Sequence, residues 1–331
     1  MTVNALTVDV EEYYHGMEFE AAVPAGERHR LRSRVEFNTG LVLDLLARRG
    51  VRATFFIVGT VAEAHPALVR RIARAGHEVA CHGYEHELVS RQTPEEFHDD
   101  LHRAKVALED LVGEPVIGYR APNYSIGRQQ AWAYDILLDE GFRYDSSVYP
   151  IFHDRYGDRS APRFPYEIWR REDGALIEFP IGTARLLGVN LPIGGGGYFR
   201  LLPTGLTRRG IQWVNAEEGR GVMFYFHPWE LDPGQPRPVM PLHHRFRHYV
   251  NLERFERKID LLLGYFQFAP ARDVLGLDSG RLRGPLPGRL SSGQFRFPEP
   301  TATVPPPRRP AERGDHVNGK PSCGGFGSSS S

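Results

Sequence analysis

Residues 53–82 read ATFFIVGTVAEAHPALVRRIARAGHEVACH, and this stretch sets the expectation for the fold. The apolar runs at 53–59 and 77–82 have the length and composition of buried strands. Between them, Pro66 suits the first turn of a helix and Gly76 suits its end. Strands that alternate with helices in this way predict a parallel sheet.

The same alternation continues on both sides of this unit. Further strands are predicted at 4–10, 116–120, 143–146, 175–181 and 221–227, and helices at 39–49, 93–111, 129–140, 207–218 and 249–266. Thr39 is the expected N-cap of the first helix, and TPEE at 93–96 is a capping box with a first-turn proline. Seven or eight such units predict an α/β fold, a distorted (β/α) barrel of seven or eight parallel strands with its active site at the C-terminal strand ends.

Composition narrows the class of protein. The 331 residues hold 41 Lys+Arg and 41 Asp+Glu, so no global basic excess points to nucleic acid or an anionic membrane. Cys81 and Cys323 form neither a disulfide framework nor a zinc spacing. The first residues lack the basic and apolar regions of a signal peptide, and no apolar run approaches the ~20 residues of a membrane span. We therefore expect a cytoplasmic protein without a membrane span, and the sequence leaves its oligomeric state open.

The end of the chain differs from the rest. Residues 281–331 contain 8 Lys+Arg against 3 Asp+Glu, and 24 of these 51 residues are Gly, Pro or Ser. Such a segment buries too little apolar surface to offset the entropy of ordering the chain. We predict a folded domain over 1–277 and a disordered Pro/Gly/Ser-rich tail over 278–331.

Polar side chains stand where the predicted strands end. They are Asp9, Glu11 and Glu12 after the first strand, His82 and His86 after the third, Arg120 on the fourth, Asp145 on the fifth and His227 on the last. In a parallel barrel these ends meet at one rim. Arg120 and Asp145 form either an orienting charge pair in the site or a plain structural salt bridge.

Histidine spacing suggests a metal site. Two histidines and one carboxylate form a facial set with open positions, which suits Zn²⁺, Co²⁺ or Fe²⁺. Water on such a metal reaches a pKa of ~7, a second carboxylate can take its proton, and a further histidine can protonate a leaving amine. His82 and His86 lie four apart beside acidic neighbours at the rim. Two similar pairs are set aside: His98/His102, which a solvated helix face explains, and His244/His248, which has basic rather than acidic neighbours.

At this point the sequence resembles a known family. TVDVEE, CHGYEH, YRAP, YDSS and FYFHP occur in the order and spacing of the polysaccharide deacetylases, carbohydrate esterase family 4, over about residues 1–275. Several stretches are similar to the exosortase-associated deacetylases of exopolysaccharide loci: NALTVDVEEYYH, YRAPNYSI, GGGYFRLLP, HPWELDPGQPRP and HYVNLER. The resemblance implies a hydrolase of carbon–nitrogen bonds, with residues 1–277 as catalytic domain. It would remove N-acetyl or O-acetyl groups from a polysaccharide or oligosaccharide.

The resemblance also implies roles for individual residues. Asp9 becomes the general base, His82 and His86 become metal ligands, and His227 becomes the general acid. From their places at the strand ends, we also count Arg120 and Asp145 among the predicted catalytic residues, as a pair that orients one of these groups.

The third metal ligand does not follow from the family's commonest pattern of two adjacent aspartates, because Val10 occupies the second of these positions. Glu11 is then the third ligand, with Glu12 as the fallback. Zn²⁺ is the expected ion.

The chain departs from the family's pattern at two further positions. Gly83 replaces a small hydroxyl residue that braces the metal-ligand loop, and Asn123 stands in place of an aromatic residue. We expect Asn123, through its backbone N–H, together with Tyr124 and Trp229 to contact the substrate. Two alternatives remain: a metal-free hydrolase of the same fold that cleaves a small cyclic amide, and an inactive carbohydrate-binding protein.

Overall fold

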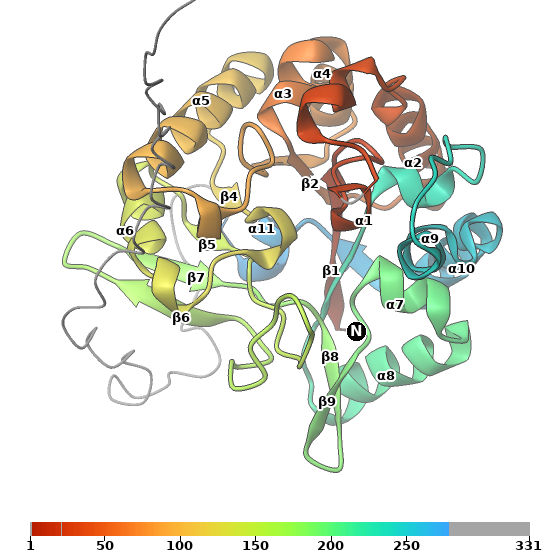
Figure 1. Ribbon diagram of the computed structural model, residues 1–331. Helices are drawn as coiled ribbons and strands as arrows, with labels where there is room; N and C mark the ends of the chain where they lie inside the picture. The colour runs from red at the N-terminus through yellow and green to blue at the C-terminus, as the bar shows by residue number, and fades with distance from the viewer. Residues whose placement is uncertain (1, 21, 278–331) are drawn as a thin grey trace, which may run out of the picture. The chain divides into compact units, whose positions relative to one another are not determined.

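A computed structural model describes residues 2–20 and 22–277, so the predicted tail at 278–331 lies outside the described residues. Its main sheet has the strand order β10-β1-β2-β3-β4-β5-β7-β6, and β11 also pairs with β1 (Figure 1). The strands are β1 (Val3–Val10), β2 (Thr54–Ile57), β3 (Glu78–Cys81), β4 (Gly118–Tyr119), β5 (Tyr144–Asp145), β6 (Tyr166–Arg170), β7 (Ala175–Glu178), β10 (Met223–Phe226) and β11 (Gln267–Ala269).

Each strand predicted from the sequence lies in this sheet. Neighbours from β10 through β7 are all parallel, which confirms the predicted α/β class, and only β6 runs antiparallel to its partner β7. Isolated parallel bridges link Ile181 to Met223 and Gly195 to Tyr225. The segments around Ile181 and Gly195 thereby reach β10 at the other end of the strand order, as in a distorted barrel.

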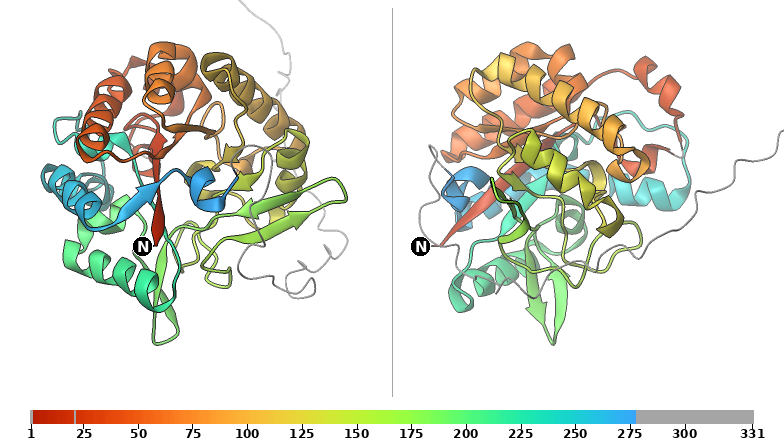
Figure 2. Two further views of the ribbon diagram at one scale, coloured as in Figure 1. Left: turned by 180° about the vertical axis from the view of Figure 1, so that it is seen from behind. Right: turned by 90° about the vertical axis from the view of Figure 1, so that its left-hand side faces the viewer.

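Helices surround the strands (Figures 1 and 2). They are α1 (Met17–Glu20), α2 (Val35–Arg49), α3 (Gly59–Ala64), α4 (Pro66–Arg74), α5 (Pro94–Val112), α6 (Trp132–Asp139), α7 (Gly196–Leu201), α8 (Thr204–Glu217), α9 (Leu242–Tyr249), α10 (Leu252–Tyr265) and α11 (Ala271–Leu275). The capping box at the start of α5 is present, because the side chains of Thr93 and Glu96 each accept from the other's backbone N–H. No helix in the described part of the chain is long and apolar enough to cross a membrane.

Several helices begin at other residues than predicted. Thr39 does not cap α2: the helix begins four residues earlier, after Arg34, and Thr39 is buried inside it. The helix expected over 249–266 is present as α10, which begins three residues later than predicted, and α9 before it was not predicted. Asn251, which separates the two helices, adopts the left-handed conformation with φ 54°. Asparagine is one of the few residues that tolerate this conformation, so the break has a local cause.

The segment after β7 forms two strands that the sequence did not predict. β8 (Thr183–Leu186) and β9 (Val189–Pro192) form a separate two-stranded antiparallel hairpin. In Figures 1 and 2 this hairpin projects from the barrel beside α8.

Candidate metal centre

The first strand delivers two carboxylates to the rim. β1 is hydrogen-bonded to β10, β2 and β11, and its interior is fully buried. Asp9 is the second-last residue of β1, and Glu11 follows directly after the strand ends. Both side chains are buried. A buried carboxylate is costly unless a cation, a proton or hydrogen bonds compensate it. Both residues therefore need charged partners.

His82 and His86 come from the loop that follows β3. Gly83 has φ 73° and His86 has φ 58°, a conformation that non-glycine residues seldom adopt. The carboxylate of Asp100, on α5, accepts hydrogen bonds from the backbone N–H groups of Tyr84 and Glu85 at 2.7 and 3.0 Å. Asp100 therefore braces the loop that carries the two histidines.

The two histidines and Glu11 form one cluster. Their ligand atoms lie within 4.8 Å of one another, and no other group of this kind occurs among the described residues. Nε2 of His86 is 2.6 Å and Nε2 of His82 is 3.9 Å from Oε2 of Glu11. Burial raises the pKa of the Glu11 carboxyl, but the imidazoles of His86 and His227 outweigh it and hold that pKa well below its usual range.

The donor set fits a divalent metal. Nδ1 of His82 lies 2.7 Å from the carbonyl oxygen of Arg120, which can only accept, so Nδ1 carries the proton. Nε2 is then left with its lone pair on the side of Glu11. Burial lowers the pKa of His82 to about 4, which keeps the imidazole neutral as a ligand requires. A neutral imidazole oriented by a carbonyl is the usual state of a metal-bound histidine.

Glu12 lies outside this cluster. Its Oε2 accepts a hydrogen bond from the backbone N–H of Arg34 at 3.1 Å, at the start of α2. The guanidinium of Arg34 in turn binds Asp232, with Nη2 3.0 Å from Oδ1. Glu12 therefore satisfies a helix N-terminus, and the geometry brings Glu11, rather than the fallback, to the two histidines.

Arg120 is not paired with Asp145, which corrects one expectation. Its Nη1 donates to Oδ1 of Asp9 at 2.6 Å and to Oγ1 of Thr7 at 3.0 Å, and its Nη2 donates to Oγ of Ser146 at 2.8 Å. The side chain of Arg120 is 1% exposed. The alternation of side chains along β4 turns Arg120 across the barrel interior toward β1, so Asp9 is its ion-pair partner.

Asp145 pairs with another carboxyl group. It lies opposite Glu178 in the register of β5 and β7, and both residues are fully buried. The charge of the Asp145 carboxylate disfavours the ionised form of Glu178. Burial raises the pKa of Asp145 to about 6 and that of Glu178 well above its usual value. The pair braces the loop after β5, since Asp145 accepts from Oγ of Ser147 and Glu178 accepts from the N–H of Val148.

His227 follows β10 and reaches the cluster from the opposite side. Its Nε2 lies 3.7 Å from Oε1 of Glu11, and its Nδ1 lies 3.8 Å from Oε1 of Glu230. Burial lowers the pKa of His227, but the two carboxylates outweigh it and raise the pKa to about 9. His227 therefore holds its proton at neutral pH.

Trp229 has a different position from the one expected of a sugar-stacking platform. Its ring lies stacked between His227 and His248, with centroid distances of 5.0 and 4.4 Å, and it is only 5% exposed. Both faces of the indole are therefore covered. Its Nε1–H donates a hydrogen bond to Oε1 of Glu11 at 3.2 Å, so it positions the carboxylate.

The segment after Arg120 holds the other two predicted substrate contacts. Asn123 and Tyr124 both have positive φ, 52° and 56°, within the turn Pro122–Tyr124. The ring of Tyr124 packs against Tyr149 and Tyr225 at centroid distances of 5.9 and 5.5 Å. Consecutive strained residues cluster at functional sites, but the aromatic ring is engaged in packing.

His15 is a neighbour of the cluster that the sequence did not predict. His15 stacks on His86 with centroids 5.0 Å apart and the rings nearly parallel. Burial lowers its pKa to about 3, so it is neutral. Its position in the loop after β1 has no periodic or spacing signal that could have identified it.

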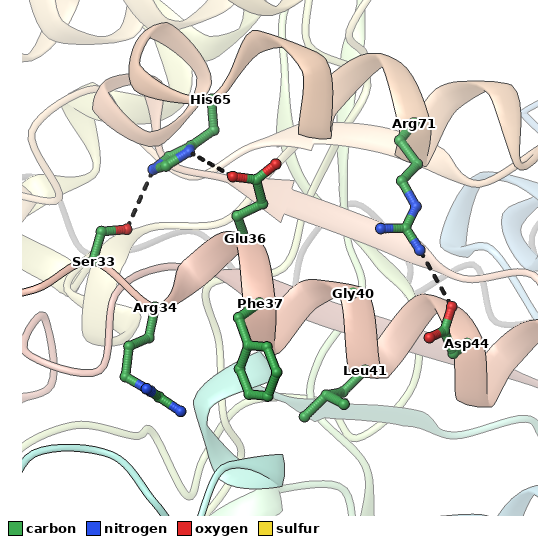
Figure 3. A pocket seen from close by; sticks show the side chains of 9 residues that line it. All are labelled: Ser33, Arg34, Glu36, Phe37, Gly40, Leu41, Asp44, His65 and Arg71. Carbon is green, nitrogen blue, oxygen red and sulfur yellow. Dashed lines mark hydrogen bonds and ion pairs between the residues drawn. The ribbon is translucent and has the colours of Figure 1, made fainter.

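A separate hollow of about 530 Å³ lies between α2 and the α3–α4 pair (Figure 3). Its charged side chains already contact one another: Nδ1 of His65 is 3.6 Å from Oε2 of Glu36, and Nη2 of Arg71 is 3.2 Å from Oδ1 of Asp44. None of the residues that line it belongs to the cluster of Glu11. The candidate metal ligands therefore lie at the strand ends and not in this hollow.

Fold and site together define a (β/α)-barrel protein with a candidate metal centre at its C-terminal strand ends. Residues 33–136 match the family model described as Polysaccharide deacetylase, and residues 146–276 match a Domain of unknown function (DUF3473). Over residues 33–136 the chain is therefore similar to the polysaccharide deacetylases.

Curated relatives match over a part of the chain. A chitooligosaccharide deacetylase of Bradyrhizobium sp. is 37% identical over 101 residues, 30% of this chain and 44% of the relative. A peptidoglycan deacetylase of Helicobacter pylori is 31% identical over 121 residues, 35% of this chain and 40% of the relative. The chain thus spans less than half the length of these relatives.

Solved structures agree with the fold. A probable polysaccharide deacetylase from Pseudomonas aeruginosa PAO1 aligns with a TM-score of 0.53 and 17% identity, covering 82% of this chain and 89% of that one. An allantoinase aligns with a TM-score of 0.53 and 16% identity, covering 82% of this chain and 88% of that one. At such identities the likeness concerns the (β/α) barrel alone.

Proposed function

We propose that this protein is a metal-dependent deacetylase that removes acetyl groups from a polysaccharide or oligosaccharide. The observation that carries the proposal is the buried cluster of Glu11, His82 and His86, with Asp9 and His227 beside it. The matching family model and the deacetylase relatives support the same reaction class.

Glu11, His82 and His86 would hold the ion, and Zn²⁺, Co²⁺ and Fe²⁺ all suit this donor set. When bound, a divalent metal supplies Lewis acidity toward the acetyl carbonyl and lowers the pKa of a coordinated water. Trp229 holds Oε1 of Glu11 and the Arg120 carbonyl orients His82, so two of the three ligands are fixed by hydrogen bonds.

Asp9 is the proposed general base. Arg120 binds its Oδ1, which leaves Oδ2 to accept a proton from the attacking water. The same ion pair fixes the direction in which the carboxylate faces. Arg120 is accordingly a positioning residue, and Asp145 supports it only indirectly, through the loop that carries Ser146 and Ser147.

His227 is the proposed general acid. With a pKa raised to about 9 it enters the reaction protonated at neutral pH, and it can donate that proton to the departing sugar amine. The stack with Trp229 fixes the plane of its ring. Base and acid are thereby held by different elements, β1 and the turn after β10.

The finer assignment is an exopolysaccharide-locus deacetylase of the exosortase-associated type acting in the cytoplasm. It rests on the segments quoted above, which extend through the region of residues 146–276. We propose an N-acetylated sugar as the first substrate to test, with Asn123 contributing its backbone N–H at the acetyl carbonyl.

Acetate release from a panel of acetylated oligosaccharides, with and without chelator and metal add-back, tests the proposal. We expect chelator-sensitive release that His82→Ala abolishes together with bound metal. His98→Ala is the matched control, because His98 lies exposed on α5. Release that survives metal removal would contradict the metal dependence. Absence of both bound metal and release would favour the metal-free cyclic-amide hydrolase, and sugar binding without any release would favour an inactive binding protein.

A further inference from the structure

The hairpin β8–β9 exposes one apolar face. Register pairs Leu186 with Val189 and Ala184 with Leu191, and these four side chains lie on the same side because alternate residues of a strand do. Leu186, Val189 and Leu191 are all exposed. The hairpin thus presents its apolar face outward.

Helix α8 extends this face. A Cβ added to Gly210 would lie 3.5 Å from Cβ of Ala184, so this side of the helix rests on the hairpin base. Leu206 and Trp213 lie four residues before and three after Gly210, on the same side of the helix. Both are exposed, Trp213 at 56%. We name this surface the apolar patch: Leu186, Leu187, Val189, Leu191, Leu206 and Trp213.

The hairpin tip adds a second, independent observation. Leu187 and Gly188, between the two strands, both have positive φ, 49° and 82°. Two-residue turns of this kind normally carry Asn, Asp or Gly at the first position. Leu187 is instead a strained leucine that is 96% exposed. Neither the backbone conformation of Leu187 nor the exposure of its side chain stabilises the isolated protein. An apolar side chain at this position therefore indicates contact with a partner.

The charge of the surrounding segment identifies the kind of partner. Residues 179–216 contain four arginines and no Asp or Glu, although the whole chain is neutral. Of these, Arg185 on the hairpin and Arg209 on α8 are exposed and have no ion-pair partner in the part of the chain that the structure describes. A twofold contact between two copies would bring like charges together, whereas an anionic surface complements them.

We propose that the apolar patch docks this protein on an anionic lipid bilayer, with the hairpin tip inserted into the interface. Apolar side chains that enter the headgroup boundary, an interfacial tryptophan and flanking arginines are the features of such binding. The hairpin projects from the barrel in both views of Figure 2, so its tip is free to reach a surface.

Vesicle partitioning of the full chain tests this proposal. We expect binding to vesicles of phosphatidylcholine with phosphatidylglycerol, weakened by salt, and little binding to phosphatidylcholine alone. Leu187→Asn should weaken binding about tenfold or more, the worth of one apolar side chain, while relieving backbone strain. Arg185→Ala should weaken it about fivefold. Trp213 emission should shift to the blue on binding, and Trp213→Phe should remove that shift.

Val239→Asn is the matched control, because Val239 is 97% exposed but lies outside the apolar patch. It should bind vesicles as the wild type does. Cooperative melting of both Asn variants, with Leu187→Asn at least as stable as the wild type, would show that both fold. Absence of wild-type binding to the anionic vesicles, or binding unchanged by Leu187→Asn, would overturn the proposal. A concentration-dependent dimer that Leu187→Asn dissociates, without vesicle binding, would assign the patch to a second copy instead.

Discussion

Trp229 donates its indole N–H to Glu11 over 3.2 Å, and in this way the turn after the last barrel strand fixes a carboxylate that follows the first. The carboxylate has one oxygen toward Trp229 and the other toward His86. A ligand with both oxygens held in place loses little freedom when it binds an ion.

Replacing Trp229 with phenylalanine should therefore weaken metal binding. The stack between His227 and His248 is retained in part, but the hydrogen bond to Glu11 is lost, and such outer partners are worth about 10–100-fold in metal affinity. Competition titration of Zn²⁺ measures the effect. Trp213→Phe, on the exposed face of α8, should leave the affinity unchanged, and an equal loss in both variants would contradict the assigned role.

The roles of Asp9 and Glu11 can be separated by two isosteric changes. Asp9→Asn should retain the metal but lose roughly 10²–10⁴-fold in kcat, the usual contribution of a positioned base. Glu11→Gln should lose metal affinity first, with activity partly recovered by excess Zn²⁺ or Co²⁺. Metal content by mass spectrometry, beside acetate release, distinguishes them. Loss of metal in Asp9→Asn with full occupancy in Glu11→Gln would reverse the two roles.

Removing Arg120 should lower the stability of the protein, because the buried carboxylate of Asp9 then has no cation beside it. Arg120→Met leaves Asp9 without its cation, and breaking a buried pair in this way typically costs about 3–5 kcal/mol in the free energy of unfolding. The double variant Arg120→Met with Asp9→Asn should recover part of that loss. Urea unfolding of the single and double variants measures it, and an additive loss in the double variant would argue against the pair.

The carboxyl pair of Asp145 and Glu178 should make stability depend on pH. Both pKa values are raised in the folded state, to about 6 for Asp145 and well above the usual range for Glu178. The folded protein therefore keeps a proton that the unfolded chain releases above about pH 4, and the contribution of the pair falls as pH rises through 6. Glu178→Gln removes one ionisable group and should flatten this decline.

Melting temperatures from about pH 5 to pH 9 give the comparison. Glu167→Gln is the control, since Glu167 is exposed on the neighbouring strand β6. The steepness of the wild-type decline should persist in the control and diminish in Glu178→Gln. Identical pH profiles in the wild type and both variants would mean that the pair does not titrate in this range.

The strands and their positions along the chain were predictable, because apolar runs and helix-capping residues are local features of the sequence. Apolar runs bounded by Pro66, Gly76 and the capping box at Thr93 correspond to observed boundaries within a few residues. Glu11, His82 and His86 could be grouped because all three follow strand ends, which a parallel barrel gathers at one rim. Thr39 misled because a polar residue that suits an N-cap is also tolerated inside a buried helix turn.

Partners across the barrel were not predictable from spacing. Arg120 and Asp145 stand on adjacent parallel strands, and only the three-dimensional direction of each side chain shows that Arg120 reaches Asp9 and Asp145 reaches Glu178. The same holds for Asp100 and Trp229, whose roles depend on elements that approach from elsewhere in the chain.

The position of β1 in the sheet has a consequence for how the protein is made. β1 leaves the ribosome before the other described strands, yet its residues Ala5 to Val8 pair with β10, near the end of the described barrel. Pairing between such distant segments is slow, because a long loop must close before contacts form. Asp9 and Glu11 are synthesised early, but they acquire His227 and Trp229 only when β10 joins the sheet. The three proposed ligands are therefore made long before the residues that complete the site, and a nascent chain that stops before β10 should lack both the hydrogen bond from Trp229 to Glu11 and the proposed acid His227.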